Sequence, residues 1–180
     1  LRTLDWENTQ IYSIDRAAFA FCKSLKIPQL PKNLNTIKEY AFEECSAIDV
    51  ITCSPRLAPI EGYAFQNCSN VDVIRISSSV RRIDNYAFAG CTNVWRMTVE
   101  AVLPPKVYDK TFDGIDRSIS LIVPAGSEEV YRQAEYWKEF FIDDTHSQSP
   151  ISNCQKILHE DHILILREGK VYTTMGQLVK

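Results

Sequence analysis

The chain repeats one short motif at a constant interval, and this repeat constrains its fold more than any other feature. Four segments contain Ala-Phe-x-x-Cys: RAAFAFC (16–22), EYAFEEC (39–45), GYAFQNC (62–68) and NYAFAGC (85–91). Successive motifs begin 23 residues apart. A constant period of this length is typical of a solenoid, whose coils cannot bury an apolar face alone and therefore stack into a continuous core.

Aliphatic residues keep the same period. They form the two sets Ile14, Ile37, Ile60, Ile83 and Leu25, Ile48, Val71, Val94. After each cysteine the residues alternate as in a strand, and the inward pairs are Ile51/Cys53, Ile74/Ile76 and Met97/Val99. This matches the L-x-x-L-x-L part of a leucine-rich repeat. We therefore predict an α/β solenoid: a short right-handed leucine-rich-repeat array with one parallel sheet and short helical turns.

A fifth unit is less regular. Val107 and Phe112 keep the five-residue spacing of Ile83 and Phe88, after a one-residue insertion near Pro104–Pro105. Its remaining positions are filled by Ile115, Leu121 and Val123. The N-terminal LRTLDW fits the repeat frame as a degenerate unit, so we assign residues 1–125 to the repeats.

The motif residues are predicted to form the core. We expect one phenylalanine ring per coil to stack along the array: Phe19, Phe42, Phe65, Phe88 and Phe112. The motif cysteines are expected to be small apolar residues with free thiols: Cys22, Cys45, Cys68 and Cys91. Free thiols are favoured over disulfides because Ile115 takes this position in the fifth unit. Adjacent coils lie about 4.8 Å apart, so bridging is not geometrically excluded. Cys154 lies outside the repeats and is not assigned.

Composition excludes some classes of partner. Hydrophobic residues make up 45% of the 180 residues, and the net charge of −3 leaves no basic footprint for nucleic acid. The apolar runs, such as 163–166, are far too short to span a bilayer. The chain does not begin with Met, and we expect a mature or trimmed product.

The repeat units resemble a known family. VDVIRISSSVRRIDNYAFAGC and IKEYAFEECSAIDVI are similar to the BspA-type leucine-rich repeats of Gram-negative anaerobes, over about residues 10–125. Two departures from the family pattern are that its glycine is kept only as Gly62 and that most units lack proline after the strand. The resemblance implies an exported protein, at the cell surface, outer-membrane-associated or extracellular, that acts in adhesion.

The segment 121–143 resembles the segment that often closes such arrays. We predict a capping helix over 126–142, with Ser127 as N-cap. Its apolar face would be Val130, Ala134, Trp137 and Phe141, and would cover the open end of the solenoid.

The remaining residues do not follow the repeat pattern. Residues 143–153 are predicted to be a linker, and 154–180 a small β unit with strands at 157–158, 162–166 and 171–173 and a hairpin turn at 167–170. This tail resembles the C-terminal segments of exported surface proteins, some of which act as sorting signals.

No catalytic set is recognisable in the sequence. The three histidines, His146, His159 and His162, lie outside the repeats. We interpret HEDH (159–162) as a solvated turn rather than a metal site, because zinc needs three or four convergent ligands. We therefore expect no enzyme activity, no cofactor and no metal.

The outward strand positions are the candidate binding surface. They form three columns across the sheet: Lys26, Asp49, Asp72, Trp95; Ile27, Val50, Val73, Arg96; and Gln29, Thr52, Arg75, Thr98. We predict a binding site on this concave face from Val50, Thr52, Val73, Arg75, Trp95, Arg96 and Thr98, since Trp and Arg are enriched in binding hot spots. Two alternatives are that the tail hairpin covers the apolar stripe, or that Trp95 packs against its neighbouring strand.

Three hypotheses for function follow. The first is a module that binds a host or bacterial surface protein. The second is a glycan- or envelope-binding protein, which requires several coplanar exposed rings rather than one tryptophan. The third is an enzyme assisted by the tail histidines.

Overall fold

The computed structural model describes residue 6, residues 9–27 and residues 29–143 in full, and in the C-terminal part the backbone of 154–159, 162–167 and 170–173. The chain divides into two compact units, Leu1–Asp143 and Asp144–Lys180. The repeats and the predicted cap belong to the first unit. Pro28 and most of the predicted linker, residues 144–153, lie outside the described residues.

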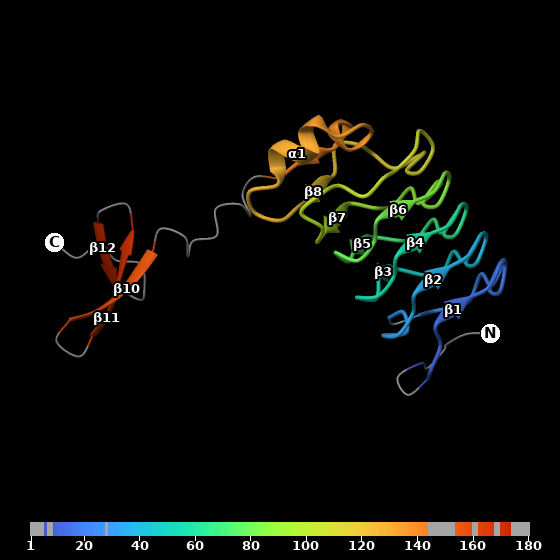
Figure 1. Ribbon diagram of the computed structural model, residues 1–180, viewed down its shortest axis with the longest axis horizontal. Coiled ribbons are helices and arrows are strands. Elements are labelled where there is room, and N and C mark those ends of the chain that lie inside the picture. The colour runs from blue at the N-terminus through green and yellow to red at the C-terminus, as the bar shows by residue number, and fades with distance from the viewer. Residues whose placement is uncertain are drawn as a thin grey trace. The chain divides into compact units, whose positions relative to one another are not determined.

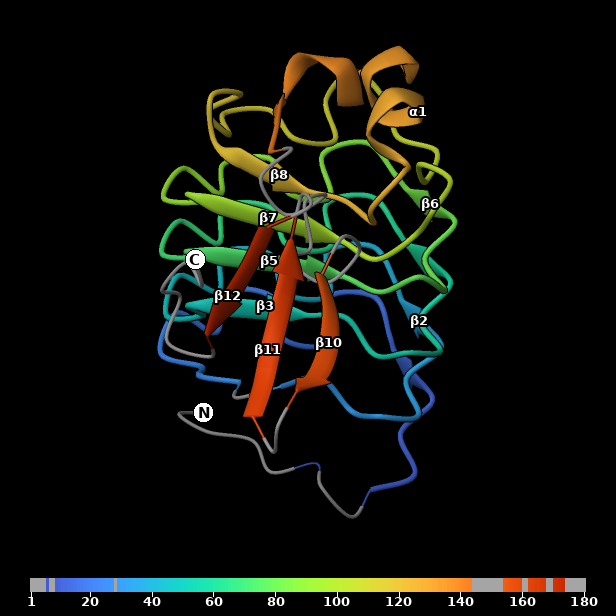
Figure 2. The same cartoon turned by 90° about the vertical axis from the view of Figure 1, so that its left-hand side faces the viewer.

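The first unit is a solenoid, and one side of its coils forms a five-stranded parallel sheet (Figure 2). Its strands, in spatial order, are β3 (Val50–Thr52), β5 (Val73–Ile76), β7 (Arg96–Val99), β8 (Ser120–Ile122) and β9 (Phe141–Ile142). The inward positions of β3, β5, β7 and β8 are the predicted pairs, and they are buried. The predicted solenoid is confirmed.

A second parallel sheet runs along the coils, and the sequence did not predict it (Figure 1). It consists of β1 (Ser13–Ile14), β2 (Thr36–Ile37), β4 (Pro59–Ile60) and β6 (Arg82–Ile83), and Lys106 continues it through a bridge to Arg82. Each strand supplies one fully buried isoleucine. Two residues per coil are too few for an alternating pattern, which explains why this sheet is invisible in the sequence.

The phenylalanine rings stack along the core as predicted. Successive ring centroids lie 5.3 Å apart for Phe19–Phe42, 5.1 Å for Phe42–Phe65, 5.4 Å for Phe65–Phe88 and 6.0 Å for Phe88–Phe112. The last four rings are buried, whereas Phe19 and Cys22 in the first coil are only partly buried. At the N-terminal end of the stack, the Trp6 ring contacts Phe19 edge-on, with the ring centroids 5.7 Å apart.

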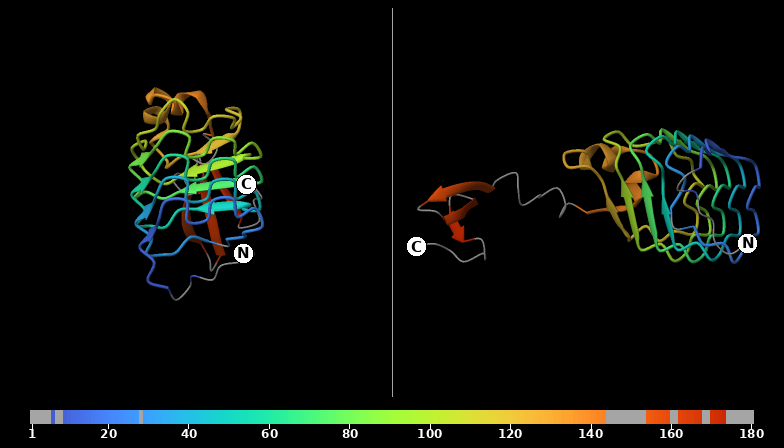
Figure 3. Two further views of the ribbon diagram at one scale, coloured as in Figure 1. Left: turned by 90° about the vertical axis from the view of Figure 1, so that its right-hand side faces the viewer. Right: turned by 90° about the horizontal axis from the view of Figure 1, so that it is seen from below.

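The Ala-Phe segments are hydrogen-bonded turns rather than helical turns. In the third coil, Ala64 N–H donates to the carbonyl of Glu61, three residues earlier, whereas Phe65 N–H donates to Ala87 in the next coil. This alternation continues through the turn, and the coils therefore stack in register (Figure 3). Left-handed backbone at Tyr63 (φ 61°) and Asn67 (φ 57°) prevents a helix from propagating.

The predicted helix over 126–142 is too long. The structure has a short helix α1 (Glu128–Gln133), a 3₁₀ turn η1 (Trp137–Glu139) and then strand β9. Tyr136 adopts left-handed backbone (φ 63°) between them, which ends helical spacing.

The predicted apolar face of this segment is right at two of its four residues. Trp137 is buried and Ala134 packs partly buried against the core, whereas Val130 and Phe141 are 42% and 62% exposed because the helix ends early. Tyr131 and Phe140 are buried as well. Tyr131 Oη donates to Ala101 O at 2.7 Å, and Trp137 Nε1 donates to Pro105 O at 2.8 Å. These two bonds attach the cap to the last coils.

The second unit contains a three-stranded antiparallel sheet of β10 (Cys154–His159), β11 (His162–Arg167) and β12 (Lys170–Thr173). His159 pairs with His162 and Arg167 pairs with Lys170. The three predicted strands are confirmed, and the first begins earlier than expected, at Cys154.

Candidate binding surface

The outward positions of the five-stranded sheet form one continuous surface. We call it the outer face and define it as the outward residues of β3, β5, β7, β8 and β9, together with Trp95, which directly precedes β7. Arg75 and Trp95 are exposed, Trp95 by 57%. The other residues predicted for this face are half-buried: Val50, Thr52, Val73, Arg96 and Thr98. The exposure of Trp95 excludes the alternative that it packs away against its neighbouring strand.

The strand register aligns these residues in columns. One column runs Val50, Val73, Arg96, Ser120, Phe141, and the next runs Thr52, Arg75, Thr98, Ile122. Sequence reasoning missed Ser120, Ile122 and Phe141. The signal that could have found Phe141 is its spacing of 21 residues from Ser120, which is close to the repeat period.

Ile27 does not belong to this surface. We expected it at the head of the Val50 column, but it is 2% exposed and belongs to the core. The described part of the first coil has no strand between Lys23 and Leu30. Its backbone therefore does not follow the in–out alternation of the later strands.

The arginine side chains of the outer face have no partner among the described residues. The ion pairs of Arg16, Lys23, Lys38, Arg82, Lys110, Arg117 and Arg132 lie on the turns, the second sheet or the cap. The side chains of Arg75 and Arg96 make no ion pair, hydrogen bond or ring contact with any residue that the structure describes. Asp49 and Asp72, at the entries to β3 and β5, are exposed.

Hydroxyl groups of the buried Ser77 and the half-buried Ser79 hold the far ends of the strands in place. Ser77 Oγ donates to Ser54 O at 2.7 Å, and Ser79 Oγ donates to Leu57 O at 2.7 Å. In each bond the donor follows β5 and the acceptor follows β3, so the bond joins one coil to the previous coil. Hydrogen bonds between coils therefore hold the backbone of the outer face in place.

A second aromatic surface lies on the turns. Tyr40, Tyr63 and Tyr86 stack with centroids 4.7 Å and 4.9 Å apart. The Arg16 guanidinium lies 5.4 Å from the Tyr40 ring centroid. Because the ring faces contact each other or Arg16, Tyr40 and Tyr63 offer only ring edges to a ligand.

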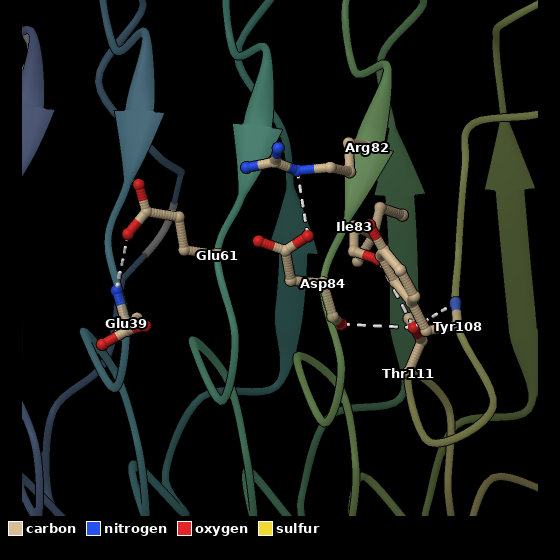
Figure 4. Close-up of polar contacts among 7 residues, drawn as sticks. All are labelled: Glu39, Glu61, Arg82, Ile83, Asp84, Tyr108 and Thr111. Atoms are coloured by element: carbon tan, nitrogen blue, oxygen red, sulfur yellow. Dashed lines mark hydrogen bonds and ion pairs between the residues drawn. The ribbon is translucent and has the colours of Figure 1, made fainter.

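The polar groups near the second sheet have structural partners (Figure 4). Arg82 Nε lies 2.9 Å from Asp84 Oδ1, and Glu39 N–H donates to a Glu61 carboxylate oxygen at 3.2 Å. Thr111 replaces the alanine of the motif, and its Oγ1 accepts from Tyr108 N–H at 2.9 Å. The Glu39–Glu61 bond joins two coils, whereas the Arg82–Asp84 and Tyr108–Thr111 contacts each lie within one coil.

The buried thiols are poor nucleophiles. Cys45, Cys53, Cys68 and Cys91 are free and buried. Burial raises the pKa of Cys45 to about 11 and the pKa values of Cys53 and Cys91 to about 12. The pKa of Cys68 is also raised, by burial first and then by its neighbours Cys91 and Cys45. These thiols stay protonated at neutral pH and have no thiolate for catalysis.

Within the described residues, no group of three or more His, Cys, Asp or Glu side chains is arranged to hold a metal ion. No helix in the same residues is long and apolar enough to cross a membrane. His146 lies outside the described residues, and His159 and His162 are described only as strand backbone.

Comparison with known families gives one match. The model of the BspA type leucine rich repeat region matches residues 1–134, in six copies, and so covers 134 of the 180 residues. A search of curated proteins finds no match to the chain. Repeats of this family form binding scaffolds, and the match points to a protein-interaction module.

Proposed function

The chain belongs to the BspA-type leucine-rich repeat family, and on that premise we propose that it is a non-enzymatic module that binds another protein through its outer face. The observation that carries the proposal is the composition of that face. An exposed tryptophan and two arginines, whose side chains have no partner among the described residues, lie beside half-buried valines on a sheet held by hydrogen bonds between coils. Tryptophan and arginine are the side chains that contribute most often to binding hot spots.

The rigid scaffold supports this assignment. The register Val73–Arg96 and Arg75–Thr98 fixes the relative backbone positions of these residues before any partner arrives. A surface that does not have to reorganise loses less conformational entropy on binding. A partner would therefore meet a preformed array of apolar and cationic groups.

We also propose that the protein is exported and acts in adhesion, at the cell surface or outside the cell, with a host or bacterial surface protein as partner. This rests on the resemblance of the repeats and of the tail to exported surface proteins. It is an argument by analogy, because the fold alone does not determine a partner.

A glycan or envelope ligand is the second candidate, and the arrangement of aromatic rings disfavours it. Sugars stack on open ring faces, and the exposed aromatic residues of the outer face are Trp95 and Phe141. Trp95 lies at the entry to β7 and Phe141 lies on β9, and strand β8 separates them. In the tyrosine stack on the turns, Tyr40 and Tyr63 offer ring edges instead of faces.

Binding of the full chain to a panel of matrix proteins, bacterial surface proteins and glycans tests the proposal. The Trp95→Ala/Arg96→Ala variant should lose the binding of a protein partner. Its matched control is Tyr12→Ala/Arg81→Ala, which removes one exposed aromatic ring and one exposed arginine near the second sheet and should bind as wild type. Binding that survives the first variant and is lost in the second would move the site to the second sheet and overturn the proposal.

A further inference from the structure

Arg75 and Arg96 are close neighbours on the outer face. The register pairs Arg75 with Thr98, two residues after Arg96 on the adjacent strand. With a strand spacing of about 4.8 Å and a rise of about 3.3 Å per residue, their Cα atoms lie about 8 Å apart. Side chains of this length can therefore reach one carboxylate together or two adjacent carboxylates separately.

These two arginines differ from the paired arginines of the chain. Arg16, Arg82 and Arg117 each lie within 3.6 Å of an acidic side chain of a nearby residue or coil. Arg75 and Arg96 have neither an acidic partner nor an aromatic ring under the guanidinium among the described residues. Arg96 is also half-buried, so its side chain lies partly against the sheet, and it has no carboxylate partner among the described residues.

The surroundings of the pair restrict the ligand. Val73 and Trp95 flank Arg96, and Thr52 and Thr98 flank Arg75 on the two adjacent strands. A small inorganic anion would leave this apolar surface in water. A protein segment with acidic and apolar side chains would cover both.

Acidic residues limit where that segment can place its charges. Asp49 and Asp72 are exposed at the entries to β3 and β5. Carboxylates of a ligand are repelled there and attracted to Arg75 and Arg96. This arrangement also disfavours nucleic acid, whose phosphates repeat along the whole ligand.

We propose that the outer face recognises carboxylate side chains of a partner protein, which pair with Arg75 and Arg96 while neighbouring apolar side chains pack on Val73 and Trp95. The guanidinium group suits this role because its planar fork binds a carboxylate through two hydrogen bonds. This inference rests on the proposed function and names the chemistry of the partner at that same site.

The test is selection of a displayed library of random dodecapeptides on the immobilised full chain. Selected peptides should be richer in Asp and Glu than the starting library and should also carry Leu, Phe or Trp. Replacing their acidic residues with Asn and Gln should weaken binding about tenfold or more. Arg75→Gln/Arg96→Gln should weaken binding by a similar factor. Arg81→Gln removes an exposed arginine outside the outer face and should leave the affinity unchanged.

Charge reversal gives an independent readout. The variant Arg75→Glu/Arg96→Glu should select basic peptides from the same library, and circular dichroism should show that it remains folded. Peptides that are not enriched in acids, or that bind Arg75→Gln/Arg96→Gln as tightly as wild type, would overturn the inference.

The same selection separates this inference from the proposed function. Peptides that lose binding to Trp95→Ala but not to Arg75→Gln/Arg96→Gln would refute carboxylate recognition and leave the outer face as a binding site. Peptides indifferent to all three changes, or no enrichment of any peptide, would count against both.

Discussion

The Cys68 thiol donates a hydrogen bond to the backbone carbonyl of Phe42, 3.1 Å away in the previous coil. The same bond joins Cys91 to Phe65 at 3.3 Å and Cys45 to Phe19 at 3.0 Å. The cysteine of the motif is therefore both a small core residue and a donor that connects coils. This double role explains why the phenylalanine and the cysteine recur together.

Removing one such thiol should have a modest effect. Cys68→Ala is expected to lower the free energy of unfolding by about 1–2 kcal/mol, because it removes a weak hydrogen bond and a small buried volume. Urea denaturation under reducing conditions measures this change. A loss above about 4 kcal/mol would mean that the thiol has a larger structural role than one weak bond provides.

Removing a ring from the stack should cost more. Phe65 is fully buried between Phe42 and Phe88, with centroids 5.1 Å and 5.4 Å away. Phe65→Ala should lower the free energy of unfolding by about 3–5 kcal/mol, since the neighbouring coils cannot close the cavity. Phe65→Leu keeps most of the volume and should cost less than half as much. Equal losses for the two variants, measured by urea denaturation, would contradict an ordered stack.

The buried thiols should make the fold less stable at alkaline pH. The pKa of Cys91 is raised from its ordinary value of 9.0 to about 12, because burial disfavours the thiolate. Below pH 9 both states hold the proton, and the free energy of unfolding is unaffected. Between pH 9 and about 12 only the unfolded state releases it, so each such thiol lowers the free energy of unfolding by about 1.4 kcal/mol per pH unit.

The measurement is urea denaturation from pH 8 to pH 10.5 with a reductant. Cys91→Ala should show a shallower decline than wild type, whereas the surface variant Trp95→Ala should keep the wild-type slope. An unchanged slope in Cys91→Ala would show that this thiol does not titrate differently in the two states.

Thr111 should be required for its hydroxyl rather than its shape. Its Oγ1 accepts from Tyr108 N–H and lies 3.2 Å from Asp84 O, to which it donates (Figure 4). Thr111→Val has nearly the same volume but leaves the Tyr108 N–H without its partner. We expect a loss of about 1–3 kcal/mol in the free energy of unfolding.

Thr111→Ser is the matched control, because it keeps the hydroxyl and removes only a methyl group. It should lose less stability than Thr111→Val in thermal or urea unfolding. The opposite order would mean that packing of the methyl group, and not the hydrogen bond, selects threonine here.

The sequence alone determined the repeat and the residues that form its core. A period of 23 residues brings equivalent positions of successive coils together, so Phe42, Phe65 and Phe88 had to meet once the chain formed coils. The columns of the outer face follow from the same period, since Val50, Val73 and Arg96 occupy one register position. Because the units repeat, a constant spacing in the sequence predicts these contacts between residues that are far apart in the chain.

Only the tertiary structure decided the features that break the period or rest on backbone conformation. Extended backbone at Ala134 (φ −77°, ψ 133°) ends α1 early, and Phe141 lies on strand β9 with its side chain exposed instead of on a longer helix facing the core. Ile27 is buried, and the described residues of the first coil form no strand that would turn it outward. The hydrogen bond from the Cys68 thiol to the Phe42 carbonyl also depends on how two adjacent coils are positioned against each other. The pattern of side chains does not predict which backbone carbonyl accepts such a bond, because every residue has the same carbonyl group.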